Sequence, residues 1–277
     1  MPLKVIALGT GVCANCISAP GPRRQPPGFL VDCDGNLLLL DASEGIRFRI
    51  EDAGYDYGAL KHVAITHSHP DHAALPQIIQ AKLCRVLWGR PVDGMNEFKI
   101  YMHEALVEKF SEVWAWHHPE GDVVYKDRLN WSCMPMRTGV ETEPFAGLKL
   151  KPFGVYHGFG QHPSLGFRLE TAQGTVVYTG DAGLTDSLFE AVANADLLIS
   201  DASSRVGQDS TAGYGHMSPK QCGEIALRGN VKELWMTHYT GLDTPAAMEE
   251  AVRATGFAGV VKAATDGLVW NGASKRV

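Results

Sequence analysis

The 277-residue chain lacks any apolar stretch near the length of a membrane span, which needs roughly 20 residues. Cysteine is scarce: six thiols spread over the chain fit reduced side chains better than a disulfide framework. The first residues also lack the apolar core and small-residue cleavage site of a signal peptide. We therefore expect a cytoplasmic protein with no membrane partner.

An excess of positive charge is absent as well. The 25 Lys and Arg are outnumbered by 31 Asp and Glu, for a net charge of −6. Such a chain has no bulk positive field to hold a nucleic-acid backbone, which counts against a large RNA or DNA partner. Hydrophobic residues make up 45% and charged residues 20%, as in ordinary soluble globular proteins.

No Pro/Gly/Ser-rich linker or charge block marks a domain boundary, so we expect a single domain over residues 1–277. Short β-rich runs alternate with amphipathic stretches. The expected strands are Lys4–Leu8, Gly28–Val31, Leu37–Leu40, His62–Thr66, Lys99–Met102, Leu148–Val155, Leu165–Leu169, Thr175–Thr179, Leu197–Ser200 and Glu233–Thr237. The expected helices are Gly45–Asp52, His72–Leu83, Glu104–Trp116, Thr185–Ala193, Pro219–Leu227 and Pro245–Ala254.

Two short patterns occur twice. Residues 61–67 and 232–238 both read as a strand that ends in Thr-His, and residues 38–42 and 177–182 both end a strand in Asp-Ala. The repetition indicates two similar β-rich halves. Their strand ends could meet at a common cleft.

The loop Thr66–His72 holds three imidazoles and a carboxylate directly after an apolar strand. Residues two apart in an extended loop face the same side, so His67 and His69 are suited to one metal ion, and Asp71 and His72 to another. A solvated polar loop is the alternative, but it would need a partner for each crowded titratable group.

Two ligands are too few for either ion, so further ligands are expected at other strand ends. His157, Asp181 and His238 each follow a predicted strand. Alone, each could be a hydrogen-bonded surface residue or a cap. Together they complete two metal sites.

The segment Leu38–Asp41, the loop Thr66–His72, His157, Asp181 and His238 resemble, in order, the five motifs of the metallo-β-lactamase superfamily. The resemblance covers nearly the whole chain and implies an αββα four-layer sandwich, two mixed sheets flanked by helices, with two metal ions at the sheet edges. It implies a first ion on His67, His69 and His157, a second on Asp71, His72 and His238, and Asp181 bridging both. Asp41 would orient the histidine loop without binding metal.

The same resemblance bears on the metal and the reaction. Diiron oxygen-reducing relatives carry Glu where His69 stands, so the ligand set looks like that of the hydrolytic branch. Nitrogen-rich ligation suits Zn²⁺, with Mn²⁺ or Fe²⁺ as alternatives. Two ions about 3.5–4 Å apart can activate a water for hydrolysis, with Asp71 as a catalytic as well as a ligating residue.

A proton donor for the leaving group is expected at His216, within Gly215-His-Met-Ser218 ahead of a helix. The alternative is an ordinary helix entry with Ser218 as the N-cap. The segments around Asp201 and His216 resemble the phosphodiesterase branch, which includes ribonuclease Z and a cyclic phosphodiesterase of carbon-phosphorus lyase pathways. The resemblance implies that Asp201 orients His216.

Ribonuclease Z enzymes carry a Gly/Pro-rich arm that clamps transfer RNA, and no such arm is seen between His72 and His157. A small or cyclic phosphodiester is therefore the expected substrate. Three alternatives stay open: a thioester, lactone or β-lactam hydrolase of the same fold, a tRNA 3′-processing endoribonuclease, and a non-enzymatic metal-binding scaffold.

Three further features are open at this stage. An aromatic-rich helical insert at about 104–131 suits a lid, a substrate wall, buried core or a homodimer surface. Cys13 and Cys16 resemble half of a structural zinc site, although two free thiols are the simpler interpretation. Arg23 and Arg24 could hold a phosphate or be surface charge.

Overall fold

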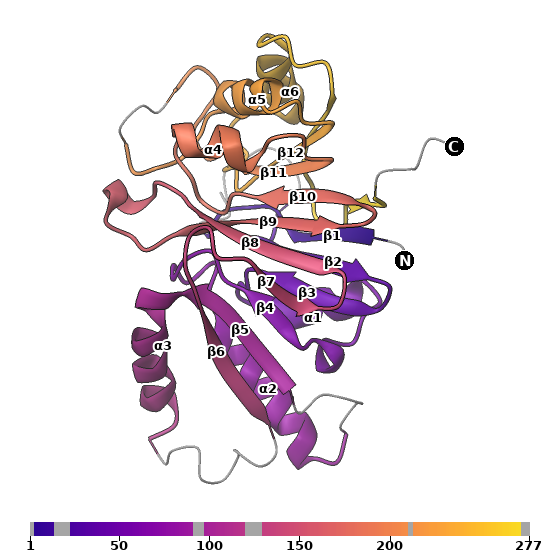
Figure 1. Cartoon of the computed structure of the whole chain (residues 1–277), viewed down its shortest axis with the longest axis vertical. Helices are drawn as coiled ribbons and strands as arrows, with labels where there is room; N and C mark the ends of the chain where they lie inside the picture. Colours follow the sequence, from indigo (N-terminus) through magenta and orange to yellow (C-terminus); the bar gives the residue numbers. More distant parts are fainter. Residues whose placement is uncertain (1–2, 14–22, 91–96, 120–128, 210–212, 273–277) are drawn as a thin grey trace.

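The computed structural model describes residues 3–13, 23–90, 97–119, 129–209 and 213–272. Their strands form two mixed seven-stranded sheets (Figure 1). The first sheet has the order β14-β1-β2-β3-β4-β5-β6 and the second β13-β12-β11-β10-β9-β8-β7.

The bounds of the elements are as follows. The first sheet holds β1 (Leu3–Gly9), β2 (Gly28–Cys33), β3 (Asn36–Leu40), β4 (His62–Ala64), β5 (Glu97–His103), β6 (Asn130–Met136) and β14 (Val269–Trp270). The second holds β7 (Thr142–Phe145), β8 (Leu148–Gly154), β9 (Leu165–Thr171), β10 (Gly174–Tyr178), β11 (Leu197–Asp201), β12 (Glu233–Thr237) and β13 (Val260–Ala263). The helices are α1 (Ile46–Asp52), α2 (Leu75–Leu87), α3 (Glu104–His117), α4 (Asp186–Ala191), α5 (Pro219–Arg228) and α6 (Pro245–Arg253), with 3₁₀ turns η1 (Tyr57–Ala59) and η3 (Gly158–Gly160).

The two sheets share a pattern of pairing. In the first, β1, β2 and β3 are antiparallel and β3 to β6 are parallel. In the second, β7 to β10 are antiparallel and β10 to β13 are parallel. The two similar halves expected from the sequence are therefore present. Because parallel strands end at the same edge, each sheet gathers the loops that follow its strands on one side.

Apolar side chains fill three layers. One core cluster lies between the sheets, where the rings of Phe29 and Tyr178 are 5.2 Å apart. A second cluster lies between the first sheet and α1, α2 and α3, and a third lies between the second sheet and α4, α5 and α6. The order helices, sheet, sheet, helices confirms the αββα sandwich.

Several boundaries differ from the sequence-based expectation. The helix predicted from His72 starts at Leu75, because Pro76 stands in its first turn and the amides of His72 and Ala73 both donate to the carbonyl of His69. The strand predicted through Thr66 ends at Ala64, since the Thr66 amide donates to the Asp41 carboxylate instead of continuing the ladder. Four strands were not predicted: β6, β7, β13 and β14.

In the aromatic segment at about 104–131, α3 covers Glu104–His117. Residues 120–128 lie outside the described ranges, and Trp131 already belongs to β6. Trp114 is 5% exposed and its ring centroid lies 5.2 Å from that of Trp131, in the core beneath α3, whereas Trp116 is 77% exposed. Within the described ranges no helix is long and apolar enough to cross a membrane.

Candidate metal centre

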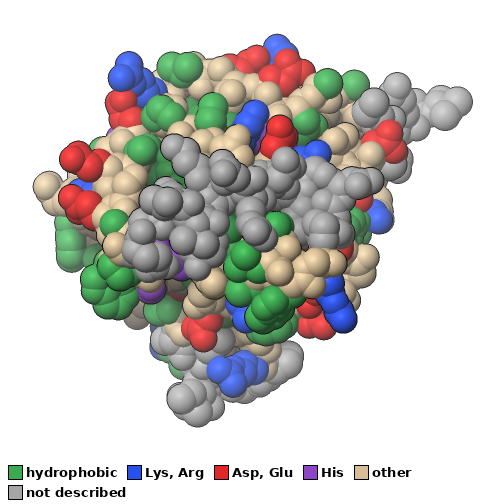
Figure 2. Space-filling model, turned by 90° about the horizontal axis from the view of Figure 1, so that it is seen from below, with side chains coloured by type: hydrophobic (Ala, Val, Ile, Leu, Met, Phe, Trp, Pro, Cys, Tyr) green, Lys and Arg blue, Asp and Glu red, His purple; other side chains and the backbone are tan. Residues whose placement is uncertain are grey.

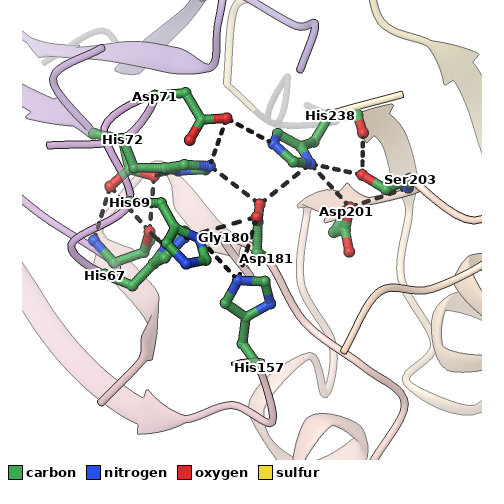
Figure 3. Close-up of polar contacts among 12 residues, drawn as sticks. His67, His69, Asp71, His72, His157, Gly180, Asp181, Asp201, Ser203 and His238 are labelled. Atoms are coloured by element: carbon green, nitrogen blue, oxygen red, sulfur yellow. Dashed lines mark hydrogen bonds and ion pairs between the residues drawn. The ribbon is translucent and has the colours of Figure 1, made fainter. Parts of the chain in front are cut away.

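The loops after β4, β8, β10 and β12 bring their polar side chains to one place (Figure 3). Three groups of ligand atoms lie within 4.8 Å of one another there. Every residue named from the sequence as a ligand belongs to at least one group: His67, His69, Asp71, His72, His157, Asp181 and His238. One of the three groups also contains Asp201 and His216, together with Asp181 and His238.

The first cluster consists of three imidazoles and one carboxylate oxygen. His69 Nδ1 lies 2.9 Å from His67 Nε2 and 3.2 Å from His157 Nε2. Asp181 Oδ2 is 3.7 Å from the Nε2 atoms of both His67 and His157. Four-coordinate zinc binds nitrogen at about 2.0–2.1 Å, and the distances between the ligand atoms of such an ion are similar to those in this cluster. The cluster therefore fits one ion.

The second cluster lies on the other side of the Asp181 carboxylate. His72 Nε2 is 3.2 Å from Asp181 Oδ1, and Asp71 Oδ2 is 3.4 Å from His238 Nε2 and 3.9 Å from His72 Nε2. His72 Nε2 and Asp181 Oδ1 are buried without a partner in hydrogen-bonding geometry. Buried polar atoms of this kind need a partner, and a cation between them would supply it. The residues therefore fit a second ion.

Each of the five imidazoles is held by a contact of its second ring nitrogen. The partners are Thr66 Oγ1 for His67 (3.0 Å), the Tyr214 hydroxyl for His69 (3.1 Å), Asp41 Oδ2 for His72 (2.7 Å), the Gly215 carbonyl for His157 (3.1 Å) and Ser203 Oγ for His238 (2.6 Å). Such contacts fix the orientation of a metal-binding histidine. Tyr214 and Ser203 were not found from the sequence, because nothing local marks them.

Asp41 is fully buried. Its carboxylate accepts from the Thr66 amide (2.7 Å), the Thr66 hydroxyl (2.9 Å), and the Tyr178 hydroxyl (2.7 Å), besides the His72 contact. Its backbone has φ of 60°, an uncommon left-handed conformation for a non-glycine residue. Asp41 is thus placed to orient the histidine loop, and no candidate ligand group includes it.

The electrostatics of the site divide the histidines into two groups. Burial lowers the pKa of His67 and His157, and it lowers that of His69 to about 4, so these rings are neutral and can donate lone pairs. For His238, burial is outweighed by Asp181, and its pKa rises to about 10.

The carboxylates of the site are ionised. Burial raises the pKa of Asp71, but His238 and His72 together bring it down to about 2. Burial also opposes ionisation of Asp181, whose pKa is nevertheless held well below its usual range by His238 and His72. The neutral imidazoles of His67, His69 and His157 beside the ionised Asp181 form the donor set that a divalent cation requires. Burial is outweighed by the carboxylates, which raise the pKa of His72 and of His238, so these two rings would release a proton when they bind a second ion.

His216 and Asp201 form a pair at the edge of the clusters. His216 Nδ1 lies 2.9 Å from Asp201 Oδ2, and the His216 ring stacks at 5.7 Å and 23° on that of His238. Asp201 is fully buried, and the amide of Ser203 also donates to it at 3.0 Å. Burial lowers the pKa of His216, but Asp201 outweighs it and raises the pKa above its ordinary value.

The helix-entry interpretation of this segment is confirmed, since Ser218 caps α5 through a capping box with Gln221. The role of His216 as a proton donor stays a prediction. Of the cysteines and arginines that the sequence singled out, Cys13 and Arg24 lie near the site. The Cys13 amide donates to Asp71 Oδ2 at 3.2 Å, and Cys16 lies outside the described residues. The Arg24 guanidinium lies 3.8 Å from the ring centroid of Tyr239, next to His238, while Arg23 is exposed.

Residues 36–239 match the model of the beta-lactamase superfamily domain. The chain belongs to the metallo-β-lactamase superfamily. With the fold and the clustered ligands, this supports a metal-dependent hydrolase.

Two relatives cover most of the chain. The probable metallo-hydrolase YhfI of Bacillus subtilis is 29% identical over 91% of this chain and 95% of its own. Its crystal structure superposes with a TM-score of 0.81 at 25% identity, covering 98% of this chain and 100% of that one. Ribonuclease Z of Picrophilus torridus is 26% identical over 86% of this chain and 85% of its own.

Proposed function

We propose that this protein is a phosphodiesterase that binds two divalent ions, zinc in the first place, and hydrolyses a small or cyclic phosphodiester. The observation that carries the proposal is the His216–Asp201 pair, 2.9 Å apart beside the ligand His238. A thioester hydrolase needs no such acid, because a thiolate leaves without a proton, whereas an alkoxide that leaves phosphorus must be protonated.

In this proposal His67, His69 and His157 would hold one ion, Asp71, His72 and His238 would hold the other, and Asp181 could contribute to both. When bound, the ions lower the pKa of a water and stabilise negative charge on the phosphate. Asp71, through its contact with His238 and its ligand role, holds the second site in shape. Asp41 keeps the ring of His72 turned toward the second ion.

His216 gives its proton to the oxygen that leaves phosphorus. Asp201 accepts from Nδ1, which places the transferable proton on Nε2, the ring atom opposite. Asp201 also favours the protonated form of His216, since it raises the His216 pKa. Because Asp201 is buried and held by backbone amides, the imidazole is oriented before substrate binds.

The charge of the chain supports a small substrate. With a net charge of −6, the protein has no general attraction for a polynucleotide. On the face seen in Figure 2, positive and negative side chains are interspersed among hydrophobic ones. The relationship to ribonuclease Z keeps tRNA 3′-end processing as a second candidate function.

The reaction class is tested with the zinc-loaded protein and four substrates: bis-p-nitrophenyl phosphate, a thioester, a lactone and a precursor tRNA. We expect the phosphodiester to have the highest kcat/KM. His216→Ala is assayed beside them on 2′,3′-cyclic AMP, whose ribose oxygen needs a proton to leave. If the thioester or lactone dominates and His216→Ala keeps full activity, the phosphodiesterase proposal is wrong; efficient cleavage of precursor tRNA would favour the second candidate. Location in the cytoplasm and a homodimeric state remain predictions.

A further inference from the structure

A cavity of about 580 Å³ lies between α2 and α3, beside the metal loop. This size falls within the roughly 300–1,000 Å³ of small-molecule sites. Its wall includes Ser68 and Pro70, which alternate with the candidate ligands of the loop. The cavity therefore starts at the outer side of the same loop that forms the metal centre.

The wall of this cavity is mainly aliphatic. Leu106, Phe110 and Val113 follow one another at helical spacing on α3, so they present one face to the cavity. Ile65, Ala73, Ala74, Leu75 and Met102 line it as well. Val113 is 45% exposed, so an apolar side chain of the rim faces solvent. Filling the space with an apolar group would remove this surface from water.

A second hollow of about 260 Å³ adjoins the cavity on the side of His162 and Tyr214. It shares Ser68, Leu106 and Lys109 with the cavity, and its other wall includes His162 and Tyr214. The Tyr214 hydroxyl is 3.1 Å from His69 Nε2, and the His162 ring lies 4.6 Å from that of His69. The two hollows therefore adjoin, and the second is bordered by two residues that contact His69.

One cation stands at the junction of the two hollows. Lys109 is exposed, and no carboxylate pairs with it among the ion pairs of the described ranges. An unpaired ammonium group at this point favours an anion that passes between the metal centre and the cavity. The phosphate of a phosphodiester is such an anion.

We propose that these two adjoining hollows bind one ester group of the substrate and that the natural substrate is a phosphodiester with an aliphatic chain. The chain fills the cavity between α2 and α3, the phosphate lies toward the metal centre, and Lys109 attracts its charge. The inference rests on the proposed function and adds to it the apolar character of one ester group.

The test compares methyl p-nitrophenyl phosphate with octyl p-nitrophenyl phosphate on the zinc-loaded protein. Each buried methylene is worth up to about a fourfold gain, so kcat/KM should favour the octyl ester at least about tenfold. Val113→Asp places a charge in the aliphatic wall and should abolish most of this preference. Ala115→Asp, an exposed position on the same helix outside the lining, should leave the preference unchanged.

Binding measured without turnover separates the two proposals. In calorimetric titrations of the same protein, octyl phosphate should bind at least about tenfold more tightly than methyl phosphate, and Val113→Asp should remove the difference. If both esters resist hydrolysis while this binding difference is present, the proposed function fails and the apolar site stands. Equal binding of the two phosphates, or an octyl preference that Val113→Asp leaves intact, overturns the site.

Discussion

The Tyr178 hydroxyl donates to Asp41 Oδ2 at 2.7 Å and so joins the two sheets across the core. Tyr178 ends β10 of the second sheet, and Asp41 directly follows β3 of the first. The same Asp41 oxygen contacts His72 Nδ1 at 2.7 Å. A single buried carboxylate therefore couples the packing of the sheets to the orientation of a candidate metal ligand.

Tyr178→Phe should weaken both the packing of the two sheets and the orientation of His72. The variant leaves a buried carboxylate with one donor fewer, which costs about 1–3 kcal/mol of unfolding free energy. Zinc affinity should fall by about 10–100-fold, because the carboxylate that orients His72 is less firmly held. Urea unfolding and competition with a zinc-chelating dye measure the two effects.

Tyr101→Phe is the matched control, because Tyr101 is also buried between the sheets and its hydroxyl contacts His62 Nδ1 at 3.2 Å, outside the site. It should change stability alone. Equal zinc affinity in Tyr178→Phe and the wild type would show that Asp41 does not need Tyr178 to orient His72.

His216→Ala should reveal its role through the leaving group. For a diester with an alkoxide leaving group, kcat should fall about 10²–10⁴-fold, since the departing oxygen must be protonated. For p-nitrophenolate, which leaves as a stable anion, the loss should be much smaller. Rates for 2′,3′-cyclic AMP and bis-p-nitrophenyl phosphate measure this. The same loss on both substrates would assign His216 a structural role.

Lys82 should make the free energy of unfolding depend on pH, independently of the metal centre. It is fully buried, and its Nζ donates to the carbonyls of Gly58 and Leu60 at 2.8 Å each. Burial lowers its pKa from 10.5 to about 7, so between these values the unfolded chain binds more protons than the folded one. Its contribution to stability therefore rises with pH across this window, by up to about 1.4 kcal/mol per pH unit.

The measurement is urea unfolding of the wild type and Lys82→Met at pH 7, 8 and 9. The wild type should gain stability relative to the variant as pH rises, because other titrating groups cancel in the difference. A difference that is constant with pH would mean that Lys82 keeps an ordinary pKa in the folded protein.

The sequence located those site residues that follow an apolar strand within a local pattern, such as His67 in its loop and Asp181 after β10. It did not locate Tyr214 or Ser203, because their contacts with His69 and His238 span 145 and 35 residues and leave no local mark. The fold was likewise predicted in part. Central apolar strands were found, whereas β6 was missed because Pro135 interrupts its run, and the two-residue β14 is too short to show a pattern.

The sequence contains a second signal for the start of α2. Pro76 is a signal for the first helical turn, and it pointed to a beginning near Leu75. The crowded residues His69, Asp71 and His72 favoured a helix that begins within the histidine loop, at His72. Residues 70–72 instead form a turn before the helix, closed by the His72 and Ala73 amides that donate to the His69 carbonyl, and His72 contacts Asp41 from this turn.

The central claim is that two ions flank the carboxylate of Asp181. An anomalous difference map at the zinc edge, from a crystal equilibrated with zinc, tests it most directly. We predict two peaks, one among His67, His69 and His157 and one among Asp71, His72 and His238. A single peak, or none, at saturating zinc would contradict the claim.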